Sequence, residues 1–236
     1  MAGAIALVGG DEFRPGCEEM DRALLEATGV PRPVLLVVPT AAAFESPSRA
    51  ASNGVSYFSD LGFDASALMV LSATDAGDEE LLSPVGTADV IYFTGGNPAH
   101  LQETLTGSIL LEHVRLALER GALVAGSSAG AMVLGPWMRF RGWTEALGLA
   151  PGVATLPHHE RSEPVEVARE LRESAPSGLT VLGIDGKTGC LGRGGEWRVI
   201  GAGGVTAYVQ GAWRRFQSGE VISPESLRLR ARDEHA

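Results

Sequence analysis

The sequence predicts an α/β fold built on a doubly wound, mostly parallel sheet, with an antiparallel ribbon near the C-terminus. Four apolar runs have the continuous hydrophobic character of strands that are buried on both faces, and they span residues 5–10, 34–39, 89–93 and 122–125. Stretches with the spacing of amphipathic helices alternate with these runs. Such alternation favours a parallel sheet with right-handed crossover connections.

Proline and glycine mark where the predicted helices of the first half begin and end. Ser46 and Pro47 are a favourable pair for the start of a helix, and Gly29 follows the end of another. Thr106 and Gly107 interrupt the longest helical pattern. The expected helices are residues 15–28, 46–61, a short one at 78–82, and 98–120, with a further strand at residues 67–71.

The second half predicts fewer helices and several short strands. We expect a loop with a short helix over residues 135–148, an amphipathic helix over residues 163–174 and a strand over residues 179–185. Glycine turns separate three runs typical of antiparallel strands, at residues 197–200, 206–209 and 212–216. These strands would form a ribbon that closes the sheet edge. Residues 1–222 are expected to form a single α/β domain and residues 223–236 a charged tail.

Composition excludes several classes of function. The chain has 236 residues, 44% of them hydrophobic, and a formal net charge of −10. It can bury a sizeable core, and it is too acidic for nucleic acid or an anionic membrane surface to be its partner. No apolar run approaches the roughly 20 residues of a membrane span, and the first residues lack the basic start of a signal peptide. We therefore expect a cytoplasmic protein. Cys17 and Cys190 are too few for a disulfide framework and have no metal-ligand spacing.

A glycine-rich turn presents a serine between a predicted strand and a predicted helix. Residues 122–125 predict the strand and residues 129–134 the helix start, so Ser128 lies at the junction. The pattern Gly126-x-Ser128-x-Gly130 matches the nucleophile elbow, in which small neighbours permit a turn that exposes a serine hydroxyl at the end of the sheet. A plain glycine-rich turn would give the same pattern.

A second glycine-rich turn follows the predicted strand at residues 89–93. Both turns fall at the carboxyl ends of strands, where ligands bind in doubly wound sheets. The backbone N–H groups of Gly96 and Ala129 would face the negative charge that develops on a substrate oxygen, and would thus form an oxyanion hole. Neither turn contains the lysine of a phosphate-binding loop, so we expect no metal or organic cofactor.

A serine hydroxyl needs a base within hydrogen-bond reach, and the chain has five histidines. His235 lies in the predicted tail, and His100 and His113 fall in a predicted helix. His158 and His159 lie in a loop that follows the serine turn in sequence. One histidine of this pair is the expected base, and the alternative is a surface pair of histidines without a catalytic role.

Four segments of the chain resemble the serine peptidase family that includes peptidase E, an aspartyl dipeptidase, and cyanophycinase. They follow the family's order and comprise residues 95–97 (Gly-Gly-Asn), 126–131 (Gly-Ser-Ser-Ala-Gly-Ala), 156–158 (Leu-Pro-His) and 181–185 (Val-Leu-Gly-Ile-Asp). The similarity extends over most of the chain, and the segment around Ser128 is the most specific. The resemblance implies a three-layer fold like that of class I glutamine amidotransferases, which is flavodoxin-like, with Ser128 as nucleophile and His158 as base.

The resemblance leaves open which acid orients the histidine. Relatives carry a glutamate directly after the position that matches Asp185, where this chain has Gly186. Asp185 is the expected third member of the catalytic triad, and Glu145 and Glu163 are the alternatives. A chain in which no acid takes this role would be catalytically weak.

Contacts to substrate are also expected from the resemblance. Peptidase E relatives read an acidic side chain with an arginine near the helix after the histidine, and this chain has Glu166 near that place, flanked by Arg161 and Arg169. These two arginines, Asn97 and His159 are the expected substrate-binding residues. The chain lacks the Asp-Gln pairs usual in cyanophycinases, so we do not expect a cyanophycin-degrading enzyme.

The sequence therefore predicts a serine hydrolase that cleaves the amide bonds of small peptides, as a dipeptidase does, through an acyl-enzyme on Ser128. One alternative is a homologue without turnover that acts as a binding or regulatory protein, in keeping with Gly186. Another is an esterase or other acyl hydrolase, and fold analogy does not separate these classes. A homodimer is compatible with each of them.

Overall fold

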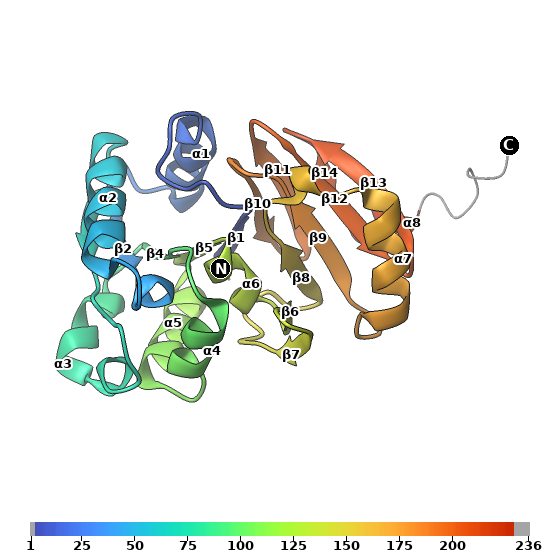
Figure 1. The fold of residues 1–236 in the computed structure, drawn as a ribbon. Helices are drawn as coiled ribbons and strands as arrows, with labels where there is room; N and C mark the ends of the chain where they lie inside the picture. Colours follow the sequence, from blue (N-terminus) through green and yellow to red (C-terminus); the bar gives the residue numbers. More distant parts are fainter. Residues whose placement is uncertain (1–2, 229–236) are drawn as a thin grey trace, which may run out of the picture.

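The centre of the protein is an eight-stranded sheet in the order β14-β11-β10-β1-β5-β4-β2-β3 (Figure 1). The structure is a computed structural model that describes residues 3–228. Parallel pairing joins β1 (Ala4–Val8), β5 (Leu123–Ser127), β4 (Val90–Phe93), β2 (Val34–Val38) and β3 (Asp64–Ala67). Antiparallel pairing adds β10 (Thr188–Arg193), β11 (Glu196–Gly201) and β14 (Val221–Ile222). The predicted mostly parallel sheet is confirmed.

Helices cover both faces of this sheet and complete a three-layer arrangement (Figure 1). One face carries α1 (Glu18–Thr28) and α2 (Pro47–Asp60), and the other carries α4 (Pro98–Leu105), α5 (Ile109–Arg120) and α6 (Ala129–Leu134). The predicted interruption at Thr106 and Gly107 separates α4 from α5. The shorter helices of this half are η1 (Thr40–Ala42), η2 (Asp75–Gly77), α3 (Glu79–Leu82) and η3 (Ser83–Gly86).

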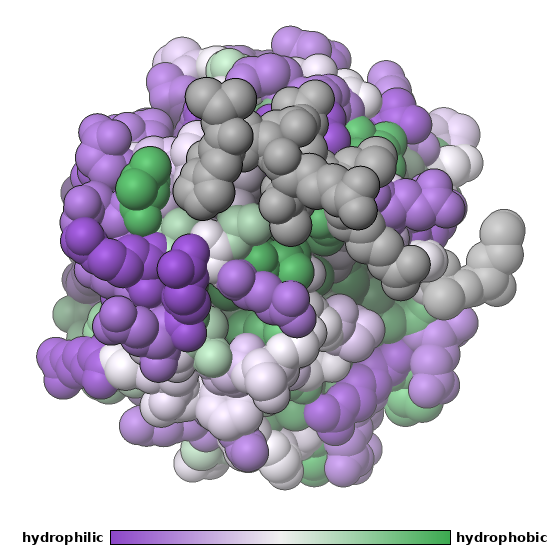
Figure 2. All heavy atoms as spheres, turned by 90° about the vertical axis from the view of Figure 1, so that its right-hand side faces the viewer, coloured by the Kyte–Doolittle hydropathy of each residue, from purple (hydrophilic) through white to green (hydrophobic). Residues whose placement is uncertain are grey.

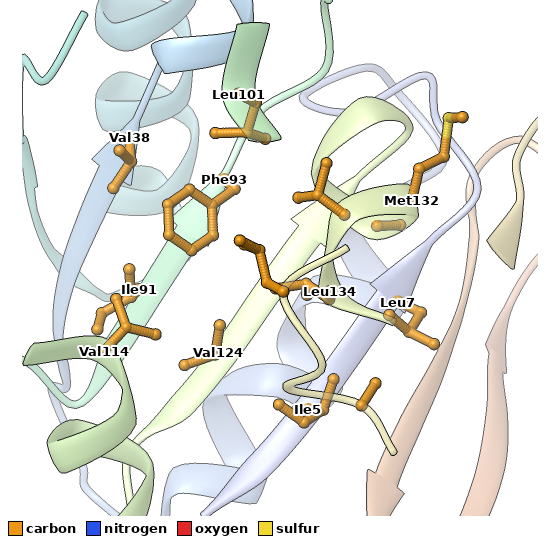
Figure 3. Close-up of a cluster of buried hydrophobic side chains, with 14 of the residues drawn as sticks. Ile5, Leu7, Val38, Ile91, Phe93, Leu101, Val114, Val124, Met132 and Leu134 are labelled. Carbon is orange, nitrogen blue, oxygen red and sulfur yellow. The ribbon is translucent and has the colours of Figure 1, made fainter. Parts of the chain in front are cut away.

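The hydrophobic core lies on both sides of the sheet because successive side chains of a strand point to opposite faces. In β1, Ala6 and Val8 pack with α1 and α2, whereas Ile5 and Leu7 pack with the residues under α4, α5 and α6. Figure 3 shows the second of these clusters, where Phe93 lies among side chains from the sheet and the helices. Continuous apolar runs such as β2 are therefore buried on both faces, as the sequence predicts.

A second sheet, in the order β13-β12-β9-β8, follows the central one. It comprises β8 (Val153–Leu156), β9 (Thr180–Ile184), β12 (Gly204–Val209) and β13 (Ala212–Gln217). The predicted strand at residues 179–185 is thus present as β9, but it belongs to this sheet. Of the three predicted ribbon strands, β11 joins the central sheet, and β12 and β13 form a hairpin of the second sheet.

Strand β1 pairs with β5 on one side and with β10 on the other. The sequence analysis did not predict β10. Glycines at Gly189 and Gly192 lower the strand propensity of this segment. The structure gives Gly192 a packing role, because a Cβ there would lie 2.5 Å from the ring of Trp197 on β11. The glycine that weakens the sequence pattern is therefore the residue that lets the tryptophan pack.

Helix α7 (Pro164–Ser174) packs on the second sheet, where Leu171 contacts the cluster formed by Val181 and Tyr208. Figure 2 views the molecule from the side of α7 and this sheet. Hydrophilic residues predominate around the margin of that face, and hydrophobic residues lie toward its middle.

Smaller differences from the predicted elements concern strand positions and the C-terminal end. Residues 135–148 contain a hairpin of β6 (Trp137–Arg139) and β7 (Trp143–Glu145) in place of the expected short helix, and the strand expected at 67–71 lies at 64–67. Of the expected tail, Pro224–Arg228 forms α8, and residues 229–236 lie outside the described residues. Among residues 3–228, no helix has the length and apolar character needed to cross a membrane.

Candidate active site

The turn that carries Ser128 is tight, and two glycines make it so. Ser128 joins β5 to α6 with a positive φ of 50° and a ψ of −108°. A Cβ at Gly126 would lie 2.4 Å from the carbonyl carbon of Gly130, and one at Gly130 would lie 2.4 Å from the Phe93 carbonyl oxygen. Only glycine fits either position. Backbone strain of this kind occurs at functional sites, and it places the Ser128 side chain at the end of the sheet.

The side chain of His158 faces this serine. Its Nε2 lies 3.4 Å from the Ser128 Oγ. His158 connects β8 to η4 (His159–Arg161) and has a positive φ of 53°. The structure thus brings together the serine and the histidine that the sequence analysis selected, at a distance typical of a catalytic pair without bound substrate.

The carboxyl end of β1 holds both residues in place. The Val8 carbonyl accepts the Ser128 N–H at 2.9 Å, and the Gly9 carbonyl accepts the His158 N–H at 2.9 Å. The next residue, Gly10, lies against the imidazole, because a Cβ there would be 2.2 Å from Cε1 of His158. The absence of a side chain at Gly10 therefore lets the histidine approach the serine.

Glu12 connects the two glycine-rich turns, and the sequence analysis missed it. Its Oε1 accepts the Gly95 N–H at 2.8 Å, and its Oε2 accepts the Ser127 hydroxyl at 2.8 Å. The available signal was its place just after β1, because loops at the carboxyl ends of parallel strands meet at the ligand edge of the sheet. Because Glu12 already accepts the Gly95 N–H, the N–H of the neighbouring Gly96 is the remaining backbone donor of this turn.

Of the predicted oxyanion donors, Gly96 lines the same cleft as Ser128, and Ala129 follows Ser128 in sequence. Gly96 has a φ of 140°, and a Cβ there would lie 2.2 Å from the Ala41 carbonyl oxygen, so the position requires glycine. Ala129 is the first residue of α6, and its N–H therefore has no carbonyl partner within the helix. No hydrogen bond from either N–H group to another residue is found within the part of the chain that the structure describes.

Asp185 does not orient His158 in this structure, which corrects the expected triad. Its carboxylate, with 6% of the side chain exposed, forms an ion pair with Arg215 on β13 and accepts the Gly204 N–H at 2.9 Å. A buried carboxylate needs such partners, and the turn after β9 directs it toward the second sheet. The Nδ1 atom of His158 is itself buried and has no hydrogen-bond partner among residues 3–228.

The two alternative acids also lie elsewhere. Glu145 is an exposed residue of β7, paired with Trp137 of the hairpin. Glu163 precedes α7 and lines a different surface cavity, together with Arg139 and Glu170. Neither residue lines the cleft that contains Ser128.

The expected substrate-binding residues are also engaged elsewhere, for different reasons. His159 is buried against Gly183, and its Nε2 lies 2.7 Å from the Tyr208 hydroxyl. Burial lowers the pKa of His159, which favours the neutral form. Asn97 caps α4, and its Oδ1 accepts the N–H groups of the next turn.

The two predicted arginines pair with neighbouring acids outside the cleft. Arg161 lies 3.2 Å from Glu160, and Arg169 pairs with Glu166 on the exposed surface of α7. The expected contacts of Asn97, His159, Arg161 and Arg169 with substrate are therefore not supported by their positions.

The cleft around Ser128 has a volume of about 650 Å³, and its walls carry charges of both signs. Arg14 lies 3.7 Å from Asp11, whereas Glu45 and Arg49 form no ion pair within the described residues. A second cavity of about 520 Å³ is lined mainly by apolar residues such as Ile5, Leu118 and Trp197. It holds neither Ser128 nor His158, so the polar cleft is the candidate active site.

No three His, Cys, Asp or Glu side chains come together as a metal site in the part of the chain that the structure describes. The expectation that catalysis needs no cofactor stays a prediction.

Comparison with known proteins adds a family to this geometry. The sequence model of Peptidase family S51 matches residues 5–200. The chain belongs to peptidase family S51. Its membership makes it a serine peptidase and agrees with the resemblance carried by the segments around Ser128 and His158.

Individual proteins are similar to this chain over most of its length. A crystal structure of a peptidase from an acI-B1 actinobacterium is 31% identical, with a TM-score of 0.83, and the match covers 94% of this chain and 97% of that one. A cyanophycinase from Synechococcus elongatus is 27% identical over 220 residues, which cover 86% of this chain and 67% of the cyanophycinase. A putative peptidase E from Listeria monocytogenes shares the fold, with 19% identity and a TM-score of 0.63 over 84% and 98% of the two chains.

Proposed function

We propose that this S51 peptidase cleaves small peptides through an acyl-enzyme on Ser128, with His158 as general base and then general acid. The observation that carries the proposal is the distance of 3.4 Å between Oγ of Ser128 and Nε2 of His158, on a turn whose strain exposes the serine. In the first step His158 takes the hydroxyl proton while Oγ attacks the peptide carbonyl carbon. His158 then gives that proton to the leaving amine, and water reverses the sequence to release the acid.

Two backbone donors support the charge that develops during this reaction. The Gly96 and Ala129 N–H groups are proposed to bind the carbonyl oxygen as it becomes an oxyanion. The Gly95 N–H already donates to Glu12, and this supports Gly96 as the donor from this turn. Loss of one such donor typically costs about 100-fold to 1,000-fold in kcat.

The charges of the cleft favour a short, zwitterionic substrate. Glu45 and Arg49 lie on the wall formed by the start of α2 and form no ion pair within the described residues. A carboxylate and a guanidinium in one cleft are suited to the ammonium and carboxylate groups of a dipeptide or tripeptide. This argument replaces the expected contacts to Arg161 and Arg169, which lie outside the cleft.

The experiment is hydrolysis of a set of dipeptides and tripeptides, followed by separation and quantification of the products. Wild-type protein is expected to release amino acids, and Ser128→Ala and His158→Ala are each expected to lower the rate by several orders of magnitude. His113→Ala is the matched histidine control and should leave the rate unchanged. Hydrolysis of esters without hydrolysis of any peptide would favour the acyl-hydrolase alternative, and full activity of Ser128→Ala would contradict the proposal.

A further inference from the structure

The unpartnered Nδ1 of His158 is the starting point of a further inference, which rests on the proposed roles of Ser128 and His158. This nitrogen is buried and has no hydrogen-bond partner among the described residues. A base that accepts a proton at Nε2 becomes an imidazolium, whose Nδ1–H then carries positive charge in a site shielded from water. Such a group is costly to leave without an acceptor, so the reaction requires one to approach.

The space next to the turn after β9 is occupied by Asp11. A Cβ at Gly186 would lie 2.6 Å from Oδ2 of Asp11. The backbone at Gly186 is outside the left-handed region, so the absence of a side chain there has no conformational cause. The missing side chain instead leaves room for the Asp11 carboxylate, which enters from the end of β1.

Asp11 is well placed to move toward the histidine. It follows Gly10, the residue that packs against the imidazole, and it lines the same cleft as Ser128 and His158. Its side chain is 27% exposed, and its Oδ1 is held only by Arg14, at 3.7 Å. Asp11 also has a positive φ of 59°, a conformation that aspartate tolerates and that occurs at functional sites.

Glu160 is the other carboxylate near this turn, and its two oxygens already have partners. Its Oε2 accepts the Gly186 N–H at 2.8 Å, and its Oε1 lies 3.2 Å from Nε of Arg161. These contacts fix the turn beside Asp11. Both oxygens of Glu160 are thus held by partners other than His158, whereas Oδ2 of Asp11 accepts no hydrogen bond from residues 3–228.

We propose that Asp11 is the positioning residue for His158, and that its carboxylate accepts the Nδ1–H hydrogen bond when substrate fills the cleft. As Oγ of Ser128 bonds to the carbonyl carbon, its proton moves to Nε2, and the Asp11 carboxylate stabilises the resulting imidazolium while remaining ionised. The proton later leaves with the amine. The acid of this site thus comes from the loop after β1 rather than from the turn after β9.

The test uses the rate at which a fluorophosphonate probe labels Ser128, because this rate needs no knowledge of the natural substrate. Asp11→Asn preserves size and the positive φ, and it is expected to slow labelling by about 100-fold to 10,000-fold. It should also shift the acid limb of the pH profile to lower pH, because loss of a nearby negative charge lowers the pKa of an imidazolium. A purely structural role would not move that limb. Asp60→Asn, at the exposed end of α2, is the matched control.

A second pair of variants tests the geometry directly. The single variant Asp11→Gly removes the carboxylate. The double variant, Asp11→Gly with Gly186→Glu, adds a glutamate carboxylate at position 186, next to the space that Asp11 occupies in the wild type. The double variant is expected to label at least about tenfold faster than Asp11→Gly alone, given the size of the orienting effect. Unfolding midpoints measured for each variant separate loss of function from loss of fold.

Two results would overturn the role of Asp11. One is a labelling rate of Asp11→Asn equal to that of wild type, with an unshifted pH profile. This result is expected if a water molecule accepts the Nδ1–H hydrogen bond of His158. The other is a large loss with Glu160→Gln and none with Asp11→Asn. Failure of the underlying reaction looks different, because Ser128→Ala would then label as fast as wild type.

Discussion

The carboxylate of Asp185 is paired with the guanidinium of Arg215, and this pair ties the turn after β9 to β13. Asp185 also accepts the Gly204 N–H from β12. The contacts join three strands of the second sheet beside the cleft. The residue expected from sequence to act in catalysis therefore has partners that give it a structural role.

Asp185→Asn is expected to lower the free energy of unfolding by about 1–3 kcal/mol, because it removes a charged hydrogen bond from a buried site whose arginine partner is partly exposed. Urea unfolding measures this loss. The labelling rate of Ser128 should stay within about threefold of wild type, since Asp185 does not contact His158. A loss of three orders of magnitude in rate with unchanged stability would restore Asp185 as the orienting acid.

Gly10→Ala is expected to abolish activity without unfolding the protein. The new methyl group would occupy the position of the His158 ring, 2.2 Å from Cε1, and would push the imidazole away from Ser128. Gly142→Ala is a close control: its φ of 119° resembles the 123° of Gly10, but nothing lies within 4 Å of a Cβ there. Both variants bear the same backbone strain, so equal labelling rates for the two would contradict the close contact.

Much of the central sheet could be predicted because its strands are buried on both faces. Runs such as β2 and β4 leave a continuous apolar pattern, and the glycines around Ser128 mark the tight turn. The serine and histidine could be selected because few chemically competent residues follow strand ends. These features depend on residues close together in sequence.

The rest of the site depends on which strands are neighbours, and the sequence does not carry that information locally. Glu12 acts on the serine turn because β1 pairs with β5, more than a hundred residues away. Asp185 was assigned to the wrong partner because β9 has the apolar pattern of a central strand, although it pairs with β12. His159 has the same local pattern as His158, and only the path of the chain after β8 buries one and exposes the other to the cleft.

Asp21→Asn is expected to change how stability depends on pH. Asp21 is 1% exposed, and burial raises its pKa from 3.8 to about 7, although the Tyr57 hydroxyl donates to its Oδ2. Because the folded state holds a proton that the unfolded state releases, the contribution of Asp21 to wild-type stability is fully present below about pH 4 and is lost as pH rises to about 7. The loss is on the order of 4 kcal/mol.

Urea unfolding at pH 4.5 and pH 8 tests this expectation. The asparagine variant should be similar to wild type at the lower pH and more stable at the higher one, because it has no buried charge to form. Asp60→Asn, whose carboxylate is exposed, should show no such difference. An unchanged gap between wild type and Asp21→Asn at the two pH values would show that Asp21 is ionised throughout.

The most direct measurement is the site of covalent modification after reaction with a fluorophosphonate, determined by peptide mass spectrometry. The proposed mechanism predicts one adduct, on the Ser128 hydroxyl, that is absent in Ser128→Ala and forms far more slowly in His158→Ala. It predicts no adduct on the neighbouring Ser127, whose hydroxyl donates a hydrogen bond to Glu12. An adduct on another serine, or labelling that persists in Ser128→Ala, would contradict the assignment of Ser128 as the nucleophile.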